Sequence, residues 1–389
     1  MSEPSSSPRL HVVDALRGFA IVSIMLLHNI EHFDFYFTPV GQPQWLISFN
    51  QVIWDTLFFL FGGKSYAIFA LLFGLTFFIQ SDNQARKGND FRGRFAWRLL
   101  LLLGFGFINS AFYEGDILTI YAILGFALIP VAKLNSKAVL WIAVILMLQP
   151  IELINFFMGL QHPEVKMANP ASWAYFAKAN DYIPGNSIIK TWIGNLTWGK
   201  SAVLLWTWEA GRVCQTISIF MLGMLAGRKK LFAPSAASNR FWLRTLIIAA
   251  VAFAPLFIIK NGLPNWISSE AVRRPLITAV STWSNLAFML ILVSLFVIAY
   301  DKLSGRVLSA FSSFGKMSMS NYIMQSIVGS FIYYGFGLGL YKYTGAAYCV
   351  LIGITLAILQ GIFSNWWMKN HRQGPLETIW HKLTWINSK

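Results

Sequence analysis

The chain has 389 residues, of which 56% are hydrophobic and only 12% are charged. A water-soluble globule of this size needs more polar surface than this composition supplies, so the soluble classes are excluded. The net charge of +15 does not indicate a nucleic-acid partner, because no zinc-finger spacing and no basic stripe interleaved with aromatic residues accompanies it. The composition therefore predicts an integral membrane protein.

About ten apolar stretches recur along the chain, each near the roughly 20 residues that a helix needs to cross a bilayer. They lie at 13–32, 52–80, 96–112, 117–132, 138–158, 201–226, 241–259, 276–299, 307–335 and 345–368. An even number of crossings puts both ends of the chain on one side of the membrane. The predicted fold class is therefore all-α, a polytopic membrane helix bundle in which residues 1–389 form a single domain.

The distribution of Lys and Arg predicts the orientation, because basic residues are retained on the cytoplasmic side. With the N-terminus inside, 20 of the 31 Lys and Arg residues fall in cytoplasmic segments and 8 in external ones, while Arg17, Lys64 and Arg212 fall within spans. Both termini are therefore expected inside, and residues 370–389 are expected to form a basic cytoplasmic tail. The positive charge also favours contact with anionic lipid headgroups.

Linkers between the predicted spans are short except for residues 159–200 and 260–275, which this orientation places outside. The first of these contains Trp173, Tyr175 and Trp192 among Asn, Gly and Pro residues. Aromatic rings in such a segment are typical of the membrane interface. Residues 159–200 are therefore predicted to form an external loop or cap, and a lid over an outward-facing cavity is the alternative.

Polar residues in the first span lie on one face of the predicted helix. At 100° per residue, an arc of about 100° contains Asp14, Arg17, His28 and Glu31. Imidazole exchanges protons near neutral pH, so His28 is a candidate general base or covalent relay, and Arg17 is a candidate for binding an anionic group. The structural alternative is that Glu31 satisfies His28 and that Asp14 pairs with Arg17.

The second span is interrupted near mid-membrane by Phe61, Gly62, Gly63 and Lys64. A break at that depth is tolerated only where protein or a wet cavity surrounds it. A buried lysine needs a partner, so Lys64 is interpreted either as a substrate-binding residue or as half of an ion pair. Glu209 and Arg212, three residues apart in the sixth span, are expected to pair with each other.

Two further polar groups lie near the ends of spans. Glu114 and Asp116 place two carboxylates at the predicted outer surface, where they either bind an acceptor or solvate the turn. In the ninth span, Asn321 and Tyr322 belong to a hydrogen-bonding face that is typical of helix-to-helix contacts in membranes. No nucleotide-binding loop, Gly-x-Ser-x-Gly elbow or metal-ligand cluster is present, so no metal or tightly bound cofactor is predicted.

Five blocks of sequence resemble those of a bacterial membrane family, and their order is the same along almost the whole chain. The blocks are RLHVVDALRGFA at 9–20, GKSYAIFALLFG at 63–74, GDILTIYAILG at 115–125, GKMSMSNY at 315–322 and GPLETIW at 374–380. They resemble the YeiB-like family (domain of unknown function 418), which is placed in the transmembrane acyltransferase superfamily. The resemblance implies a multi-pass protein of the bacterial plasma (inner) membrane.

The same resemblance implies an activity. Related membrane acyltransferases carry an Arg and a His separated by ten residues in their first helix, and Arg17 and His28 have this spacing. In that group the Arg is associated with the acyl-CoA donor and the His with catalysis. The chain is therefore expected to transfer an acyl group from cytoplasmic acyl-CoA to an extracytoplasmic sugar, hydroxyl or amine acceptor.

The expected roles in this reaction follow from charge and position. His28 is expected to deprotonate the acceptor or to carry the acyl group, and Glu31 or Asp116 is expected to orient His28. Residues expected to bind substrate or stabilise an oxyanion are Asp14, Arg17, Lys64, Arg94, Arg98 and Asn321. The expected partners are the lipid bilayer, acyl-CoA, the external acceptor and a possible second copy of the chain. The alternatives are a transporter or channel for a small metabolite or ion, and a non-catalytic membrane scaffold.

Overall fold

The computed structural model of the chain describes residues 10–302 and 306–386, and within these ranges it is all α-helical without a strand. Arg9 and the last three residues of the predicted tail lie outside the described residues. The predicted all-α class is therefore confirmed.

The helices follow one another without long irregular segments. In the first half of the chain they are α1 (His11–Ile30), α2 (Gln44–Phe61), α3 (Ser65–Ala85), α4 (Arg92–Phe112), α5 (Ile117–Gly125), α6 (Leu128–Val131), α7 (Ser136–Met147), α8 (Pro150–Gln161), α9 (Ala171–Ala177), α10 (Ala179–Tyr182) and α11 (Ile188–Gly194). In the second half they are η1 (Asn195–Gly199), α12 (Lys200–Glu209), α13 (Arg212–Arg228), α14 (Ala236–Trp266), α15 (Glu270–Lys302), α16 (Arg306–Lys316), α17 (Ser318–Tyr333), η2 (Leu340–Lys342), α18 (Ala346–Asn370) and α19 (Pro375–Thr384).

Seven stretches in the described ranges are long and apolar enough to cross a membrane. They are α1, α2 with α3, α4, α7 with α8, α14, α15 and α18. The pair formed by Ile188–Glu209 and α13 is bent by 74° and makes an eighth if it counts as one span. The two other predicted spans, 117–132 and 307–335, are divided into short helices. A multi-pass membrane bundle is compatible with these findings, whereas the count of ten stays a prediction.

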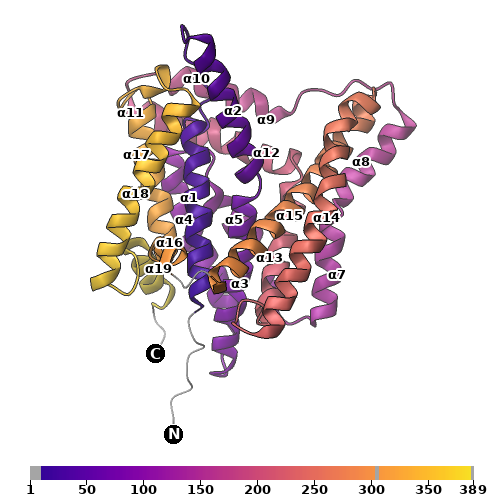
Figure 1. Cartoon of the computed structure of the whole chain (residues 1–389), viewed down its shortest axis with the longest axis vertical. Helices are drawn as coiled ribbons and strands as arrows, with labels where there is room; N and C mark the ends of the chain where they lie inside the picture. Colours follow the sequence, from indigo (N-terminus) through magenta and orange to yellow (C-terminus); the bar gives the residue numbers. More distant parts are fainter. Residues whose placement is uncertain (1–9, 303–305, 387–389) are drawn as a thin grey trace.

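The helices form two groups that meet around a central layer (Figure 1). On one side, α1 packs against α16 and α18, with α17 close by. On the other side, α14 packs against α15, and α15 packs against α8. Between them, α3 lies against α13 at a very short separation, because an added Cβ on Gly74 or Gly223 would overlap a backbone carbonyl oxygen of the facing helix. Small residues allow such approaches between helices in membranes.

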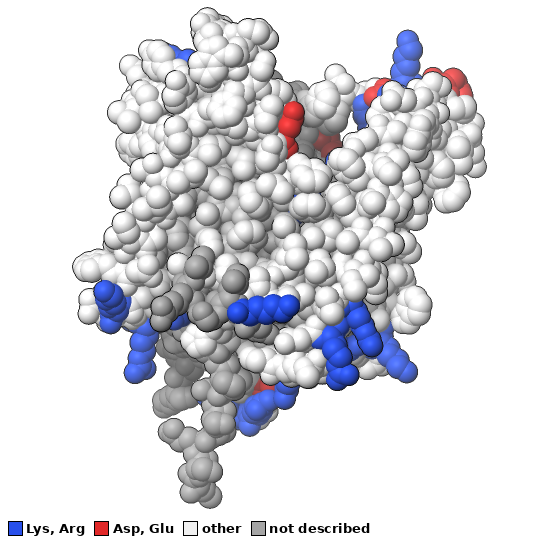
Figure 2. All heavy atoms as spheres, in the orientation of Figure 1, with Lys and Arg blue, Asp and Glu red and all other residues white. Residues whose placement is uncertain are grey.

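Charged side chains are segregated along the long axis of the molecule (Figure 2). Lys and Arg gather at the lower end, where α3, α13 and α14 end or begin. The surface is hollowed in its upper half, and acidic side chains lie at this hollow. The wide band between the two ends is almost free of charge on the face shown.

Candidate functional site

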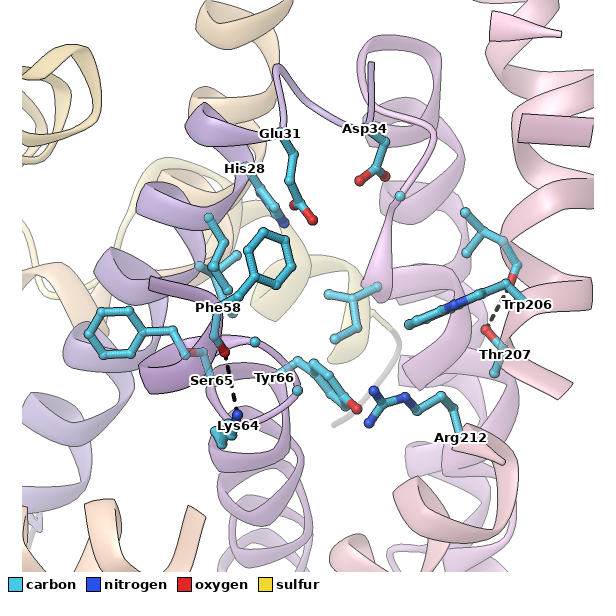
Figure 3. A pocket seen from close by; sticks show the side chains of 18 of the residues that line it. His28, Glu31, Asp34, Phe58, Lys64, Ser65, Tyr66, Trp206, Thr207 and Arg212 are labelled. Carbon is cyan, nitrogen blue, oxygen red and sulfur yellow. Dashed lines mark hydrogen bonds between the residues drawn. The ribbon is translucent and has the colours of Figure 1, made fainter. Parts of the chain in front are cut away.

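A cavity of about 930 Å³ lies between the two groups of helices (Figure 3). Its wall is made by α1, α2, α3 and α5 on one side and by α12 to α15 on the other, and α9 and α10 contribute Trp173 and Asn180. The linker 159–200 therefore contributes to the wall of the cavity. Aromatic rings supply much of the lining, and the polar side chains divide into an acidic end and a cationic end.

Two helix breaks shape the cavity. The predicted interruption of the second span is confirmed, since α2 ends at Phe61 and α3 begins at Ser65. Gly63 in this break has φ +76°, and a Cβ there would lie 2.7 Å from the side-chain nitrogen of Asn285 and 3.4 Å from a guanidinium nitrogen of Arg212. Only a glycine lets these two side chains approach the backbone so closely.

The second break, between α12 and α13, occurs at Gly211, whose φ is +67°. The 74° bend at this point makes Arg212 the first residue of α13 and turns its side chain into the cavity (Figure 3). Neither break is followed by a polar linker, so both occur inside the bundle. A break at such depth is tolerated where it lines a cavity, as both of these do.

The acidic end of the cavity is formed just beyond the C-terminus of α1. Three successive residues, His32, Phe33 and Asp34, have positive φ angles of 47°, 57° and 64°, and the turn they make brings Asp34 to the cavity. The hydroxyl of Tyr36 donates a hydrogen bond of 3.1 Å to Glu31. Glu31 and Asp34 thus lie at the same end of the cavity (Figure 3).

Burial changes the protonation of both carboxyls. Desolvation raises the pKa of Asp34 to about 7, although a hydrogen bond with Tyr113 acts in the opposite direction. Desolvation, together with the negative charge of Asp34, also raises the pKa of Glu31. Nearby Glu114 is fully buried, and its pKa is raised by desolvation for the same reason. This end of the cavity can therefore hold or release protons near neutral pH.

His28 lies in the last turn of α1, and its ring points into the same end of the cavity (Figure 3). The ring packs against Tyr113, with centroids 4.4 Å apart, and against Phe33 at 5.6 Å. Its Nδ1 atom is buried and has no hydrogen-bond partner in the part of the chain that is described. Aromatic packing orients the imidazole. No hydrogen bond joins Glu31 to His28 in the described residues, so the structural alternative in which Glu31 satisfies His28 is not supported.

The cationic end of the cavity contains Lys64, Arg212 and Lys260. Lys64 is only 8% exposed, and its Nζ makes a long hydrogen bond of 3.4 Å to the carbonyl of Phe58. The same ammonium lies 5.9 Å and 5.5 Å from the ring centres of Phe59 and Phe288. No carboxylate lies within ion-pair distance of this lysine in the described ranges, so the predicted ion pair is absent there.

Arg212 is not paired with Glu209, and that prediction was wrong. The guanidinium of Arg212 donates 2.7 Å to Gln215 and lies over the ring of Tyr66, while its Nε is buried without a partner in the described chain. Glu209 accepts hydrogen bonds from the backbone nitrogens of Ala171 and Ser172 instead. The bend at Gly211 separates the two side chains, which a continuous helix would have placed on one face.

Asp116 does not reach the cavity, so no contact supports its predicted role in orienting His28. It is fully buried at the N-terminus of α5, where it accepts hydrogen bonds from the Thr119 backbone at 2.9 Å and from Asn109 at 2.9 Å. Lys200 lies 3.6 Å away. The prediction that Glu114 and Asp116 lie at the outer surface was wrong, because Glu114 is fully buried as well.

Arg17 and Asp14 form the predicted pair, at 3.4 Å, and Arg17 also donates 3.0 Å to Thr76 of α3. Neither residue lines the cavity. His28 lies eleven positions after Arg17 in the same helix, which is roughly 16 Å along the axis. Fully buried apolar side chains such as Ile21 fill the interval. The two ends of the predicted polar stripe are therefore separated by a packed layer.

The side chains of Arg94 and Arg98 contact α19, so they are not free to bind a substrate as predicted. Arg94 donates 2.8 Å to the carbonyl of Thr384 and Arg98 donates 3.2 Å to its hydroxyl, while the Arg98 guanidinium lies 4.2 Å from the ring centre of Trp380. Half of the predicted basic tail is thus a helix, α19, which packs on α4 and α17. Access of a donor to either arginine would require α19 to move.

Asn321 is fully buried and also lies away from the cavity. Its side-chain nitrogen donates 3.1 Å to the carbonyl of Phe314 and 3.0 Å to the hydroxyl of Ser364, so it joins α17 to α18. The predicted helix-to-helix role is confirmed for this residue. The predicted role in stabilising an oxyanion has no supporting contact.

Sequence reasoning missed Asp34, Asn285 and Lys260 as cavity residues. Asp34 follows the first span by a few positions, so its nearness to His28 and Glu31 was a usable signal. The other two lie on α14 and α15, far along the chain. No spacing rule within one helix could have brought them to Lys64.

Comparison with known proteins agrees with the resemblance of the sequence blocks. Residues 226–387 match the family described as "Protein of unknown function (DUF418)". The chain is 29% identical to the uncharacterized protein YxaH of Bacillus subtilis (strain 168), over 98% of this chain and 96% of the relative. It is 25% identical to the uncharacterized protein YeiB of Escherichia coli (strain K12), over 96% and 95%. The chain is therefore similar to YxaH and YeiB over almost its whole length, and to the DUF418 family model over residues 226–387.

Proposed function

We propose that the chain is an acyltransferase of the bacterial plasma membrane, which takes an acyl group from cytoplasmic acyl-CoA and gives it to a hydroxyl or amine acceptor outside. Both termini are then cytoplasmic. The gathering of Lys and Arg at the lower end in Figure 2 supports this orientation, because basic residues are retained inside. The cavity would open toward the acceptor side.

One observation carries the proposal: His28 points into the cavity beside Glu31, and its Nδ1 is buried without a partner in the described chain. A purely structural histidine at this depth would be expected to have both ring nitrogens satisfied or solvated. An imidazole held by packing and open on one side to a cavity can accept a proton from a bound acceptor.

In the proposed reaction, the acceptor oxygen or nitrogen attacks the thioester carbon while the imidazole of His28 takes the acceptor's proton. The bond between carbon and sulfur then breaks, the new ester or amide leaves, and CoA departs as a thiolate that receives the proton from the imidazolium. The carboxyls of Glu31 and Asp34 can accept hydrogen bonds from other hydroxyls of the acceptor and so orient it. An acyl-imidazole relay on His28 is the variant of this step that protein labelling would detect.

The donor has to cross the packed layer between Arg17 and His28. Arg17 lies at the basic end of α1, where an anionic donor would be bound, and the layer that includes Ile21 and Leu72 is closed in this structure. Transfer across the membrane therefore requires α1 and α3 to separate at this level. Such opening motions commonly occur on the microsecond to millisecond scale.

The test incubates the purified protein in detergent or nanodiscs with radiolabelled acetyl-CoA and several longer acyl-CoAs, and follows free CoA and protein-bound label. His28→Ala is compared with His162→Ala, a control at a histidine that lies exposed on the linker after α8. We expect CoA release or labelling that is lost in His28→Ala and kept in His162→Ala. Absence of turnover and of donor binding in every variant, at all chain lengths, would contradict the proposal.

A second function is favoured by a different observation, the broken α2–α3 helix that presents Lys64 to the cavity. Discontinuous helices at mid-membrane commonly form substrate sites in transporters. In that case sealed vesicles containing the protein would accumulate a small metabolite or ion without consuming acyl-CoA. Lys64→Gln would reduce the uptake, whereas His28→Ala would leave it unchanged. Absence of uptake, together with CoA release that depends on His28, would favour the enzyme.

A further inference from the structure

The cationic end of the cavity has no role in the proposed proton transfer. Lys64 comes from the α2–α3 break, Arg212 from the start of α13 and Lys260 from α14, yet all three line one cavity. Their charges are close enough to repel one another: Lys64 interacts electrostatically with Lys260 and Arg212, and Lys260 with Arg212. Three separate segments thus bring like charges together inside the bundle.

A purely structural cluster would contain a compensating acid, because charges at bilayer depth are costly and normally pair. In the described ranges no carboxylate lies within ion-pair distance of any of the three. Contacts with aromatic rings compensate in part, since the Arg212 guanidinium lies 4.8 Å from the ring centre of Tyr66 and 5.5 Å from that of Trp206. Such contacts stabilise a cation less than a charge partner would.

Hydrogen-bond donors are also left over at this end. The Nε of Arg212 is buried without a partner, and the only hydrogen bond of the Lys64 ammonium in the described part of the chain is the long one to Phe58. The amide of Asn285 and a guanidinium nitrogen of Arg212 both lie against the backbone of Gly63, the residue before Lys64. An arrangement of several donors around three positive charges matches a group that carries two negative charges and several oxygen acceptors.

We propose that Lys64, Arg212 and Lys260, with Asn285, form a binding site for a phosphate group at the cationic end of the cavity. The phosphate belongs either to a small soluble molecule or to the headgroup of a lipid that enters from the bilayer. Phe59, which is 41% exposed, and Phe253 line the same cavity and would contact an apolar tail in the second case. The site stands apart from catalysis by His28, so binding tests it whether or not the chain transfers an acyl group.

The experiment uses the full chain purified in a phosphate-free nonionic detergent. One arm measures binding of radiolabelled inorganic phosphate by scintillation proximity. The other measures binding of phosphatidic acid by native mass spectrometry, with diacylglycerol as the matched lipid that lacks the phosphate. Each arm compares the parent with Lys64→Gln and Arg212→Gln, and with Lys166→Gln as a control at an exposed lysine on the linker after α8.

We expect the parent to bind one of the two probes and to melt at a higher temperature in its presence. Lys64→Gln and Arg212→Gln should each weaken this binding at least tenfold, and Lys166→Gln should leave it unchanged. Binding of inorganic phosphate identifies a soluble ligand, and binding of phosphatidic acid alone identifies a lipid. If Lys64→Gln or Arg212→Gln fails to fold, Lys260→Gln on the outer wall of the cavity serves as the substitute.

Two results would overturn the inference. The first is that the parent binds neither inorganic phosphate nor phosphatidic acid above the level of diacylglycerol. The second is that folded variants at the three cations bind the probe as tightly as Lys166→Gln does. Loss of acyl transfer in His28→Ala with phosphate binding intact would support the site as a separate feature.

Discussion

Glu377 of α19 stabilises the first turn of α17, and its replacement by alanine should destabilise the folded protein. Its Oε1 accepts hydrogen bonds from the backbone nitrogens of Met319 at 2.7 Å and Ser320 at 3.1 Å, and its Oε2 accepts one from the Ser320 hydroxyl. The N-cap residue of α17, Met317, supplies no side-chain hydrogen bond. A carboxylate from a different helix therefore caps the N-terminus of α17, and its negative charge interacts favourably with the positive end of the helix dipole.

The magnitude follows from the groups that lose their acceptor. Met319 and Ser320 are buried, so Glu377→Ala leaves two backbone N–H groups and the Ser320 hydroxyl without an acceptor. Each unsatisfied buried group costs about 1–3 kcal/mol, and the loss should therefore reach about 3–5 kcal/mol. Glu377→Gln keeps a carbonyl oxygen at the same reach for both backbone groups, so its loss should be about 1 kcal/mol.

Thermal unfolding of the detergent-solubilised protein, followed by tryptophan fluorescence, measures this difference. Glu377→Ala should melt several degrees below the parent, Glu377→Gln should fall between them, and Glu164→Ala on an exposed linker should match the parent. The reasoning is refuted if Glu377→Ala melts with the parent. It is also refuted if alanine and glutamine are equally damaging, because the retained carbonyl oxygen would then contribute nothing.

Three other outcomes are expected. The pKa of Asp34 is raised to about 7 from an unfolded value near 3.9, so between these pH values the folded state holds a proton that the unfolded chain releases. Stability should therefore fall as pH rises from about 3.9 to about 7, and Asp34→Asn should flatten that part of a profile of melting temperature against pH. Gly223→Ala should lower the melting temperature by several degrees, because the added Cβ would overlap the α3 backbone. Gly361→Ala has open space around it and should melt at or above the temperature of the parent, so equal melting temperatures of the two variants would contradict the close packing of α3 on α13. Arg98→Ala should release α19 and speed tryptic cleavage in the segment that follows residue 369. An unchanged cleavage rate would show that the contacts of Arg98 with α19 do not hold that helix.

The last two sequence blocks show that a sequence pattern can reveal a family resemblance without revealing a contact in space. The block at 315–322 contains the start of α17, and the block at 374–380 contains the carboxylate that caps it. Their resemblance to family blocks was visible in the sequence, but their contact with each other was not. The pairing depends on α18 returning the chain to the level of α16, which no local spacing expresses.

The candidate site was predicted in part. His28, Glu31 and Lys64 were singled out from polar positions within apolar spans, and all three line the cavity. Asp116 and Asn321 were selected for the same reason, yet Asp116 forms a helix cap and Asn321 forms a helix-to-helix contact. A costly polar residue inside a bundle is explained equally well by a site or by a structural hydrogen bond, and only its neighbours distinguish the two.

The sequence by itself determined the helical class, the apolar character of most helices and the position of the break between α2 and α3, because these depend on composition, period and glycine content along the chain. The tertiary structure alone decided which polar groups meet. Helical spacing assigns a residue to a face, but the helix that covers this face comes from elsewhere in the chain. The separation of Arg212 from Glu209 by one bend, and its approach to Lys64 and Lys260, are contacts of this kind.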